Sequence, residues 1–428
     1  MKELHLVCNA HLDPVWMWDW QEGAAEAIST FYSAVELADE FDYVFCHNEA
    51  LLYEFIEEYD HALFSRIQEL VKSGKWRIMG GWYLQPDVVA PSGESIMRQI
   101  YLGRKFFGEK FGVKSTTALN FDSFGHPRGL TTALKKCGYD SYIICRPMND
   151  RFPLEENPFS WVGADGSKIK VFRMDGESMY CSPLGHAEEN IRQKLALLGE
   201  RDYAMVLWGV GNHGGGPSRK DLQDIERMMN DEQYKIIHSY PEAYFEKVEP
   251  KFEVRETLGN IFIKCYSSMS RVKRRHVELE NALYLTEKMV SAADSVKGIA
   301  DYTKEFDAVM RDMAFIEFHD IMSGTCAEDG ERSALKKGEH ALEILDNVKL
   351  KAFFALTEDF EKAKENTFPI MVFNPNPYAV ETVTEAEFLL VDSISNDDFK
   401  YEITAFVDGK QIDCQVIKEL SNINYDRR

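Results

Sequence analysis

The fold of this chain is decided by the stretch LHLVCNAHLDPVW at residues 4–16. Its first part, Leu4 to Asn9, is a short apolar run of the kind that forms a buried strand. His11 and Asp13 follow directly, and alternation along an extended backbone places positions i and i+2 on the same side. One imidazole and one carboxylate can therefore reach a common point, and zinc accepts both kinds of ligand. An ordinary turn is the alternative, because such a tripeptide also arises by chance.

The pattern that begins with this strand continues to about residue 260. Short β-branched or aromatic runs alternate with amphipathic helical segments, which is typical of β/α units around a parallel sheet. We predict strands at 4–9, 43–47, 76–79, 117–121, 141–145, 204–208 and 235–237, and helices at 24–39, 49–72, 94–111 and 130–136. The predicted fold is therefore α/β, with a seven-stranded parallel β/α domain at residues 1–264, which we expect to form an irregular barrel. In such a sheet, functional residues gather where strands end.

The rest of the chain has a different character. Three long helical stretches, 271–294, 302–322 and 333–364, predict a three-helix bundle at residues 265–367. After Phe368, alternating β-branched residues with Asn-Pro and Asp-Gly turns predict the beginning of a β-sandwich domain at 368–428. Two or three hairpin strands cannot bury their own faces, so we expect this last domain to be truncated.

Composition excludes several classes of partner. Lys and Arg total 49 against 71 Asp and Glu, and the formal net charge of −22 disfavours nucleic acids and anionic membrane surfaces. No apolar stretch reaches the roughly 18 to 20 residues that cross a bilayer. The N-terminus lacks the pattern of a secretory signal, and none of the eight cysteines forms a CxxC pair. We expect a reduced, cytoplasmic protein, whose oligomeric state stays open, a homo-oligomer included.

Two further motifs carry residues that suit metal chemistry. NFDSFGHP at 120–127 presents Asp122 at the end of a predicted strand, and FHDIMSGT at 318–325 places His319 at the end of a predicted bundle helix. Each has an ordinary reading when taken alone, because an aspartate often caps a turn and a helical histidine often packs in a core. The motifs gain weight only in combination with His11 and Asp13.

In combination, the motifs resemble those of glycoside hydrolase family 38, the class II α-mannosidases, over almost the whole chain. The segment from Ser267 also resembles the family's entry into its helical bundle. The matching stretches are HLDPVW at 11–16, GGWYLQPD and PSGESIMRQ within 80–99, NFDSFGHP at 120–127, GNHGGGPS at 211–218 and FHDIMSGT at 318–325.

The resemblance implies a metal site and a nucleophile. It implies that His11, Asp13, Asp122 and His319 bind one zinc ion per chain, with another divalent ion as the alternative, and that Asp122 is the catalytic nucleophile. A carboxylate has two oxygens, so one can face the metal while the other attacks the anomeric carbon. Four protein ligands leave no position for an activated water, so the metal would hold the vicinal hydroxyls of a mannoside. The expected enzyme is a retaining, exo-acting α-mannosidase.

The general acid/base is where the sequence departs from part of the family. Many relatives carry an aspartate in the loop that here reads WGVGNHGGGP at 208–217, which contains no carboxylate. We predict that His213 replaces it, because histidines change charge near neutral pH, where a general acid/base works best.

The resemblance also implies residues that bind the substrate. Trp16 and Phe124 would offer apolar ring faces to the sugar, Asp320 would hydrogen-bond its hydroxyls, and Arg146 would set the charge of Asp122. Asp87 either faces the pocket or caps a turn.

Two alternatives to the mannosidase stay open at this point. A metal-dependent carbohydrate deacetylase or amidohydrolase also gathers histidines and aspartates at strand ends, but it needs an open metal position for water. An inactive carbohydrate-binding homologue gains weight from the missing loop aspartate.

Overall fold

The computed structural model describes residues 2–174, 180–196, 199, 201–211, 213–230, 234–259, 261–365, 367–388 and 403–418. The chain divides into two compact units, Met1–Leu356 and Thr357–Arg428. The three-domain division expected from the sequence stays a prediction.

The first sheet of the larger unit is built around the opening strand. Strand β1 (Lys2–Cys8) pairs in parallel with β2 (Phe45–His47), β8 (Tyr203–Trp208) and β9 (Tyr234–His238), and β2 pairs in parallel with β3 (Trp76–Ile78). The last five residues of β1 are buried, as expected of an apolar strand that is covered on both faces. The turn that carries His11 and Asp13 therefore leaves the sheet from a central strand.

The second sheet has the order β10 (Glu253–Val254), β6 (Phe159–Val162), β7 (Lys168–Arg173), β5 (Ser141–Ile144) and β4 (Thr117–Asn120). Strands β4, β5 and β7 are parallel, whereas β6 and β7 form an antiparallel hairpin. The structure confirms the α/β class and contains all seven predicted strands, while closure into a barrel stays a prediction.

Strands β6, β7 and β10 were not expected from the sequence. The β6–β7 hairpin turns through Asp165 and Gly166, where Gly166 has a φ of 83° and Ser167 donates backbone and side-chain hydrogen bonds to the Asp165 carboxylate. An Asp-Gly pair between alternating strands is a strong hairpin signal. The sheet is therefore mixed at this edge rather than wholly parallel.

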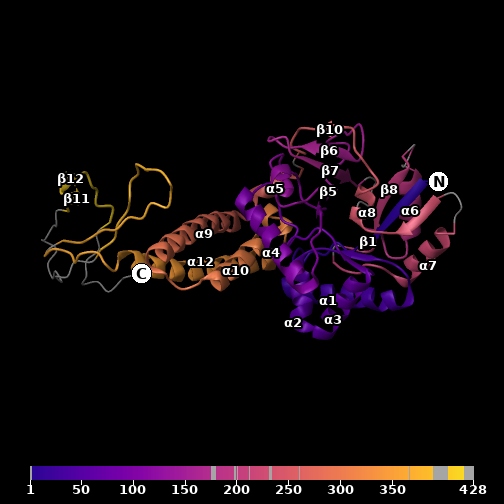
Figure 1. Cartoon of the computed structure of the whole chain (residues 1–428), viewed down its shortest axis with the longest axis horizontal. Coiled ribbons are helices and arrows are strands. Elements are labelled where there is room, and N and C mark those ends of the chain that lie inside the picture. The colour runs from indigo at the N-terminus through magenta and orange to yellow at the C-terminus, as the bar shows by residue number, and fades with distance from the viewer. Residues whose placement is uncertain are drawn as a thin grey trace. The chain divides into compact units, whose positions relative to one another are not determined.

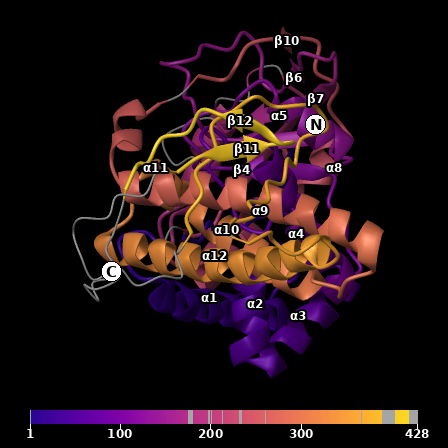
Figure 2. The same ribbon diagram turned by 90° about the vertical axis from the view of Figure 1, so that its left-hand side faces the viewer.

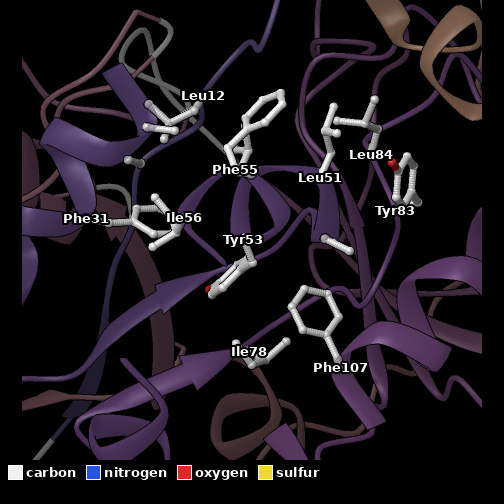
Figure 3. Packing of buried hydrophobic residues seen from close by; sticks show 14 of the residues in the cluster. Leu12, Phe31, Leu51, Tyr53, Phe55, Ile56, Ile78, Tyr83, Leu84 and Phe107 are labelled. Atoms are coloured by element: carbon white, nitrogen blue, oxygen red, sulfur yellow. The ribbon is translucent and has the colours of Figure 1, made fainter. Parts of the chain in front are cut away.

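Helices α1 (Trp20–Glu40), α2 (Ala50–Tyr59) and α3 (His61–Ser73) pack together beside the first sheet (Figures 1 and 2). The single helix expected at 49–72 is divided at Asp60, whose side chain accepts a hydrogen bond from the Leu63 N–H and so begins a new helix. Figure 3 shows part of the core beneath these helices.

This core is rich in aromatic side chains. The Tyr53 ring lies between Phe31 and Phe107, with ring centroids 5.0 and 5.2 Å away (Figure 3). Tyr53 also accepts a hydrogen bond from the indole N–H of Trp76 at 2.8 Å. Such edge-to-face pairs give this part of the core a fixed geometry.

The remaining helices of this part are α4 (Gly93–Phe111), α5 (Leu130–Lys136), α6 (Ala187–Ala196), α7 (Arg219–Met228), α8 (Pro241–Phe245) and the short 3-10 turn η1 (Ile263–Ser267).

Three long helices lie side by side after this turn: α9 (Ser270–Lys297), α10 (Thr303–Ile316) and α12 (Glu328–Thr357) (Figure 2). The helix expected at 302–322 is broken, because the chain extends at Phe318, which forms a β-bridge with Pro86. His319 therefore begins the short helix α11 (His319–Ser323) and does not end a bundle helix as expected.

The smaller unit contains one antiparallel pair among its described residues, β11 (Ala405–Val407) and β12 (Lys410–Ile412). Asp408 and Gly409 join them with φ values of 50° and 73°, as a type I′ turn requires. The β-sandwich stays a prediction. In the part of the chain that the structure describes, no helix is long and apolar enough to cross a bilayer.

Candidate metal centre and active site

Two imidazoles and one carboxylate converge where β1 ends. Asp13 Oδ1 lies 3.0 Å from His11 Nε2 and 3.3 Å from His319 Nε2. The two rings are stacked with centroids 5.5 Å apart, and all three side chains are buried. The sequence predicted that these residues would meet, although 306 positions separate Asp13 from His319.

The ligand atoms of this cluster fit a shared cation. Two atoms that each lie about 2 Å from one zinc ion are roughly 3.3 Å apart in a tetrahedral arrangement, close to the separations found here. His11 Nε2, Asp13 Oδ1 and His319 Nε2 are buried and have no hydrogen-bond partner of acceptable geometry among the described residues. Buried polar atoms without partners are costly, and a bound cation would satisfy all three at once.

The electrostatics of the cluster depend on the same three groups. Burial alone would raise the pKa of the Asp13 carboxyl, but the nearby imidazoles of His11 and His319 hold it well below its usual range. Burial lowers the pKa of His319, whereas its contact with Asp13 and the charge of Asp320 raise it to about 9. The carboxylate therefore stays ionised and attracts positive charge, which is what a cation-binding site requires.

The Asp122 carboxylate pairs with a guanidinium outside this cluster. Asp122 follows Phe121, whose ring centroid is 6.1 Å from that of His11. Its Oδ1 atom contacts the Arg146 guanidinium, and Arg146 Nη1 also donates to the Asp122 carbonyl at 3.2 Å. Within the described residues, the group of close ligand atoms comprises His11, Asp13 and His319. The structure therefore brings together three of the four predicted metal ligands and places the fourth beside a guanidinium.

The predicted substrate-binding residues occupy different surroundings. Arg146 lies over the rings of Phe124 and Phe262, 5.9 and 5.7 Å from their centroids. Burial lowers the pKa of this guanidinium, while the charges of Tyr180, Asp320 and Asp13 oppose the shift. Arg146 thus contacts Asp122 and also interacts with the charge of Asp13 in the cluster.

Asp320 lies within α11, and Trp16 contacts the segment that follows this helix. Burial raises the pKa of the Asp320 carboxyl to about 6, against the opposing charge of His319, whose Nε2 is 3.7 Å from Asp320 Oδ2. Thr325 donates its hydroxyl to the same carboxylate. Trp16 is half-buried, and its carbonyl accepts from the Ala327 N–H at 2.7 Å. Each predicted position is therefore built into the loops around the cluster.

Asp87 proves to be a turn residue. Its Oδ1 accepts from the backbone N–H groups of Val89 and Ala90, both at 2.8 Å, and its Oδ2 accepts from the Tyr266 hydroxyl. Both carboxylate oxygens are therefore engaged in holding local structure.

The glycine-rich loop after β8 brings His213 toward the turn that follows β1. Gly209 has a φ of 117°, and a Cβ there would lie 2.1 Å from the Asn9 carbonyl oxygen, so the close approach requires glycine. The His213 ring stacks on Trp18 with centroids 4.2 Å apart, and Trp18 donates its indole N–H to the Asp13 carbonyl at 3.0 Å. His213 Nε2 also pairs with Glu22 at 2.7 Å.

Several residues of the site were missed in the sequence. Trp18 and Glu22 lie just after the HLDPVW motif, and the aromatic cluster there is the only signal that could have found them. Tyr180 packs its ring 4.6 Å from that of His11, and no local pattern marks it. Gln85 lies within the QPD motif and contacts both imidazoles of the cluster.

The fold and the site together define a class of protein. Beside the end of a strand, the α/β fold gathers two imidazole nitrogens and a carboxylate oxygen that have no hydrogen-bond partner among the described residues. This arrangement defines a candidate metal-binding α/β enzyme. The glycosyl hydrolases family 38 N-terminal domain matches residues 1–263, and the alpha mannosidase middle domain matches residues 260–356. The chain belongs to glycosyl hydrolase family 38.

Individual relatives agree with this membership. The chain is 26% identical over 342 residues to alpha-mannosidase 2C1 of Homo sapiens, a match that covers 76% of this chain and 32% of that protein. It is 23% identical over 346 residues to the alpha-mannosidase of Saccharomyces cerevisiae, covering 75% and 31%. The chain thus spans about a third of the length of these relatives.

A solved structure shares the fold. The alpha-mannosidase of Enterococcus faecalis V583 superposes with a TM-score of 0.74 at 18% identity, over 84% of this chain and 43% of that one.

Proposed function

We propose that this chain carries the catalytic centre of a zinc-dependent, retaining, exo-acting α-mannosidase that acts through a covalent mannosyl-aspartate intermediate. The observation that carries the proposal is the convergence of His11, Asp13 and His319 in a chain that belongs to glycosyl hydrolase family 38. The same membership favours a glycosidase over a deacetylase. A resident zinc ion, rather than another divalent cation, is part of the proposal.

The proposed metal ligands are His11, Asp13, His319 and Asp122. The first three present ligand atoms that make no hydrogen bond within the described residues, whereas Asp122 Oδ1 contacts the Arg146 guanidinium. When bound, zinc would supply an electrostatic hold on the vicinal hydroxyls of the terminal mannose. The chain's own residues would then orient the sugar and carry out the bond exchange.

Asp122 is the proposed nucleophile. One carboxylate oxygen attacks the anomeric carbon, the bond to the leaving oxygen breaks, and a mannosyl-Asp122 ester forms. Water then attacks the same carbon, releases mannose with retained configuration and restores the carboxylate. Arg146 contacts this carboxylate and would hold it in position, while the half-buried Trp16 and the ring of Phe124 would line the sugar's apolar face.

His213 is the proposed general acid and base. It would donate a proton to the leaving oxygen in the first step and accept one from water in the second. Its pairing with Glu22 and its stacking on Trp18 support this role, because they orient the imidazole beside the residues that carry Asp13.

A trapping experiment tests the proposed function. The protein is loaded with zinc and incubated with a 5-fluoro-mannosyl fluoride, which keeps both vicinal hydroxyls, forms the glycosyl ester by loss of its anomeric fluoride and hydrolyses that ester slowly. Peptide mass spectrometry is expected to find the added fluoro-mannosyl group on Asp122, and aryl α-mannosides are expected to release their phenol. Release of acetate from an acetylated sugar, with no adduct, would instead support a deacetylase. If the protein catalyses neither reaction, the result would support an inactive carbohydrate-binding homologue.

A further inference from the structure

Gln85 contacts three separate segments of the proposed metal centre. Its side-chain nitrogen lies 3.0 Å from His11 Nδ1, and its backbone carbonyl accepts from His319 Nδ1–H at 2.8 Å. Its side-chain oxygen accepts from the N–H of Phe121, the neighbour of Asp122, at 2.7 Å. Gln85 is fully buried. One residue therefore ties together the three segments that carry the proposed ligands.

The orientation of the Gln85 amide follows from its partners. A backbone N–H can only donate, so the group that faces Phe121 must be the amide oxygen. The amide NH₂ then faces His11 Nδ1 and donates to it, and a ring nitrogen that accepts a hydrogen bond carries no proton. The neutral His11 ring consequently bears its proton on Nε2, the atom that faces Asp13.

This tautomer differs between the two imidazoles. His319 donates from Nδ1 to the Gln85 carbonyl, which leaves its Nε2 free to bind a metal, the usual arrangement for a histidine ligand. His11 needs its proton on Nδ1 to bind a metal through Nε2, and that proton would point at the NH₂ of Gln85. Rotating the amide would satisfy His11 but would turn the NH₂ toward the Phe121 N–H.

The backbone of Gln85 is held by a second buried side chain. Glu49 is fully buried and accepts from the Gln85 N–H at 3.0 Å. Its backbone has a φ of 69°, a conformation that a non-glycine residue adopts only when its surroundings impose it. The contact fixes the position from which Gln85 reaches both rings.

We propose that Gln85 is a positioning residue that holds His11 in the Nε2–H tautomer, so that metal binding has to break one of the two hydrogen bonds of its side-chain amide. The inference rests on the metal site proposed above. Gln85 thereby weakens the hold of the site on its metal, and replacing its NH₂ with an acceptor would strengthen it.

The tautomer can be measured without any metal or substrate. Metal-free protein labelled with ¹⁵N-histidine is examined by NMR at alkaline pH, with the His11 resonance identified by its loss in His11→Asn. Wild-type protein is expected to show His11 protonated on Nε2, and Gln85→Glu is expected to show it protonated on Nδ1. A wild-type ring protonated on Nδ1 would overturn the proposal, and this measurement needs no variant of Gln85 to fold.

Zinc affinity gives the second readout, by competition with a chromophoric chelator. Outer-sphere partners of ligand histidines change metal affinity by about 10- to 100-fold, so Gln85→Glu is expected to bind zinc at least about tenfold more tightly than wild type. Equal or weaker binding by a folded Gln85→Glu protein would contradict the proposal.

The matched control is Gln99→Glu. Gln99 is also fully buried, and its side-chain oxygen also accepts from a backbone N–H, that of Leu84, but its nitrogen faces Ala314 and Glu317 and no proposed ligand. A gain in Gln99→Glu equal to that in Gln85→Glu would assign the effect to added charge and overturn the proposal. If wild type and both variants bound no zinc, the proposed function would be refuted. The NMR measurement of the His11 tautomer would still test the role of Gln85 independently.

Discussion

Arg146 contacts Asp122 at two points, its carboxylate and its backbone carbonyl. A guanidinium that holds both fixes the direction of the carboxylate as well as its charge. Arg146 thus orients the proposed nucleophile independently of any metal. The role of Asp122 as nucleophile can therefore be separated from its role as metal ligand.

Substitutions of Asp122 should reveal these two duties. Asp122→Ala removes both the nucleophile and a proposed ligand, so we expect kcat to fall at least about 10⁴-fold and bound zinc to decrease. Asp122→Asn keeps one oxygen for the metal but is a poor nucleophile, so it should lose turnover as severely while retaining more zinc. Steady-state kinetics and metal analysis on the same preparations provide the measurement. Equal loss of zinc and of turnover in Asp122→Asn would argue that Asp122 acts only as a ligand.

Zinc should stabilise the folded chain through His319. A ligand that binds only the folded state raises the free energy of unfolding, by about 2.7 kcal/mol when it is present at 100 times its Kd. We expect the melting temperature of the metal-free protein to rise on adding zinc and expect little rise in His319→Ala. Calorimetry with and without zinc measures both. Asp87→Asn alters a nearby turn residue that is no proposed ligand and serves as the control, which should still respond to zinc.

The contact of His276 with Glu317 should make stability depend on pH. The two side chains are buried and 3.0 Å apart, and although burial lowers the pKa of His276, its hydrogen bond to Glu317 and the charges of Glu317 and Glu280 raise it above its usual value. A raised folded pKa means that the pair's contribution is fully present below the ordinary histidine pKa, near 6.5. The contribution is lost as pH rises through the folded value.

The pH effect can be isolated with His276→Gln, which keeps a donor but cannot become charged. Losing one partner of a buried ion pair costs about 3–5 kcal/mol, so the variant should be much less stable than wild type at pH 6. The difference should shrink in alkaline solution. Urea unfolding of the two proteins across this range measures it, and a difference that grew with pH would contradict the assignment.

The convergence of His11, Asp13 and His319 was predicted from the resemblance of their motifs to those of glycoside hydrolase family 38, because each motif taken alone also allows an ordinary reading. The sequence pattern placed His319 at the wrong end of a helix, because the break before it depends on the bridge between Phe318 and Pro86, a contact between distant segments. Periodicity alone continues a helix through such a point.

The role of Gln85 was beyond the reach of local patterns. The two imidazoles that it contacts are 74 and 234 positions away, and its amide orientation depends on the backbone N–H of Phe121, just after β4. The β6–β7 hairpin, by contrast, carries a local turn signal at Asp165-Gly166, which is typical of an antiparallel pair and does not fit a pattern of parallel β/α units. Local chemistry thus predicts which residues are functional, whereas the hydrogen bonds that orient them depend on tertiary contacts.

The proposed role of His213 makes a prediction about leaving groups. A general acid matters most when the leaving oxygen is a poor leaving group, because such an oxygen needs a proton as its bond breaks. His213→Ala should therefore lose about 10²- to 10⁴-fold in kcat/KM on a mannobiose but much less on a dinitrophenyl mannoside. Glu22→Gln, which keeps a neutral partner for the imidazole, should show a smaller loss of the same kind.

A series of aryl mannosides measures this dependence, with the slope of log kcat/KM against leaving-group pKa as the readout. The slope should become steeper in His213→Ala than in wild type. His186→Ala serves as the control, because His186 is exposed and pairs with Glu189 in the first turn of the helix α6 that follows it. An unchanged slope in His213→Ala would remove His213 from the acid role and leave the proton to another group near Asp13, such as Asp320, whose pKa burial raises to about 6.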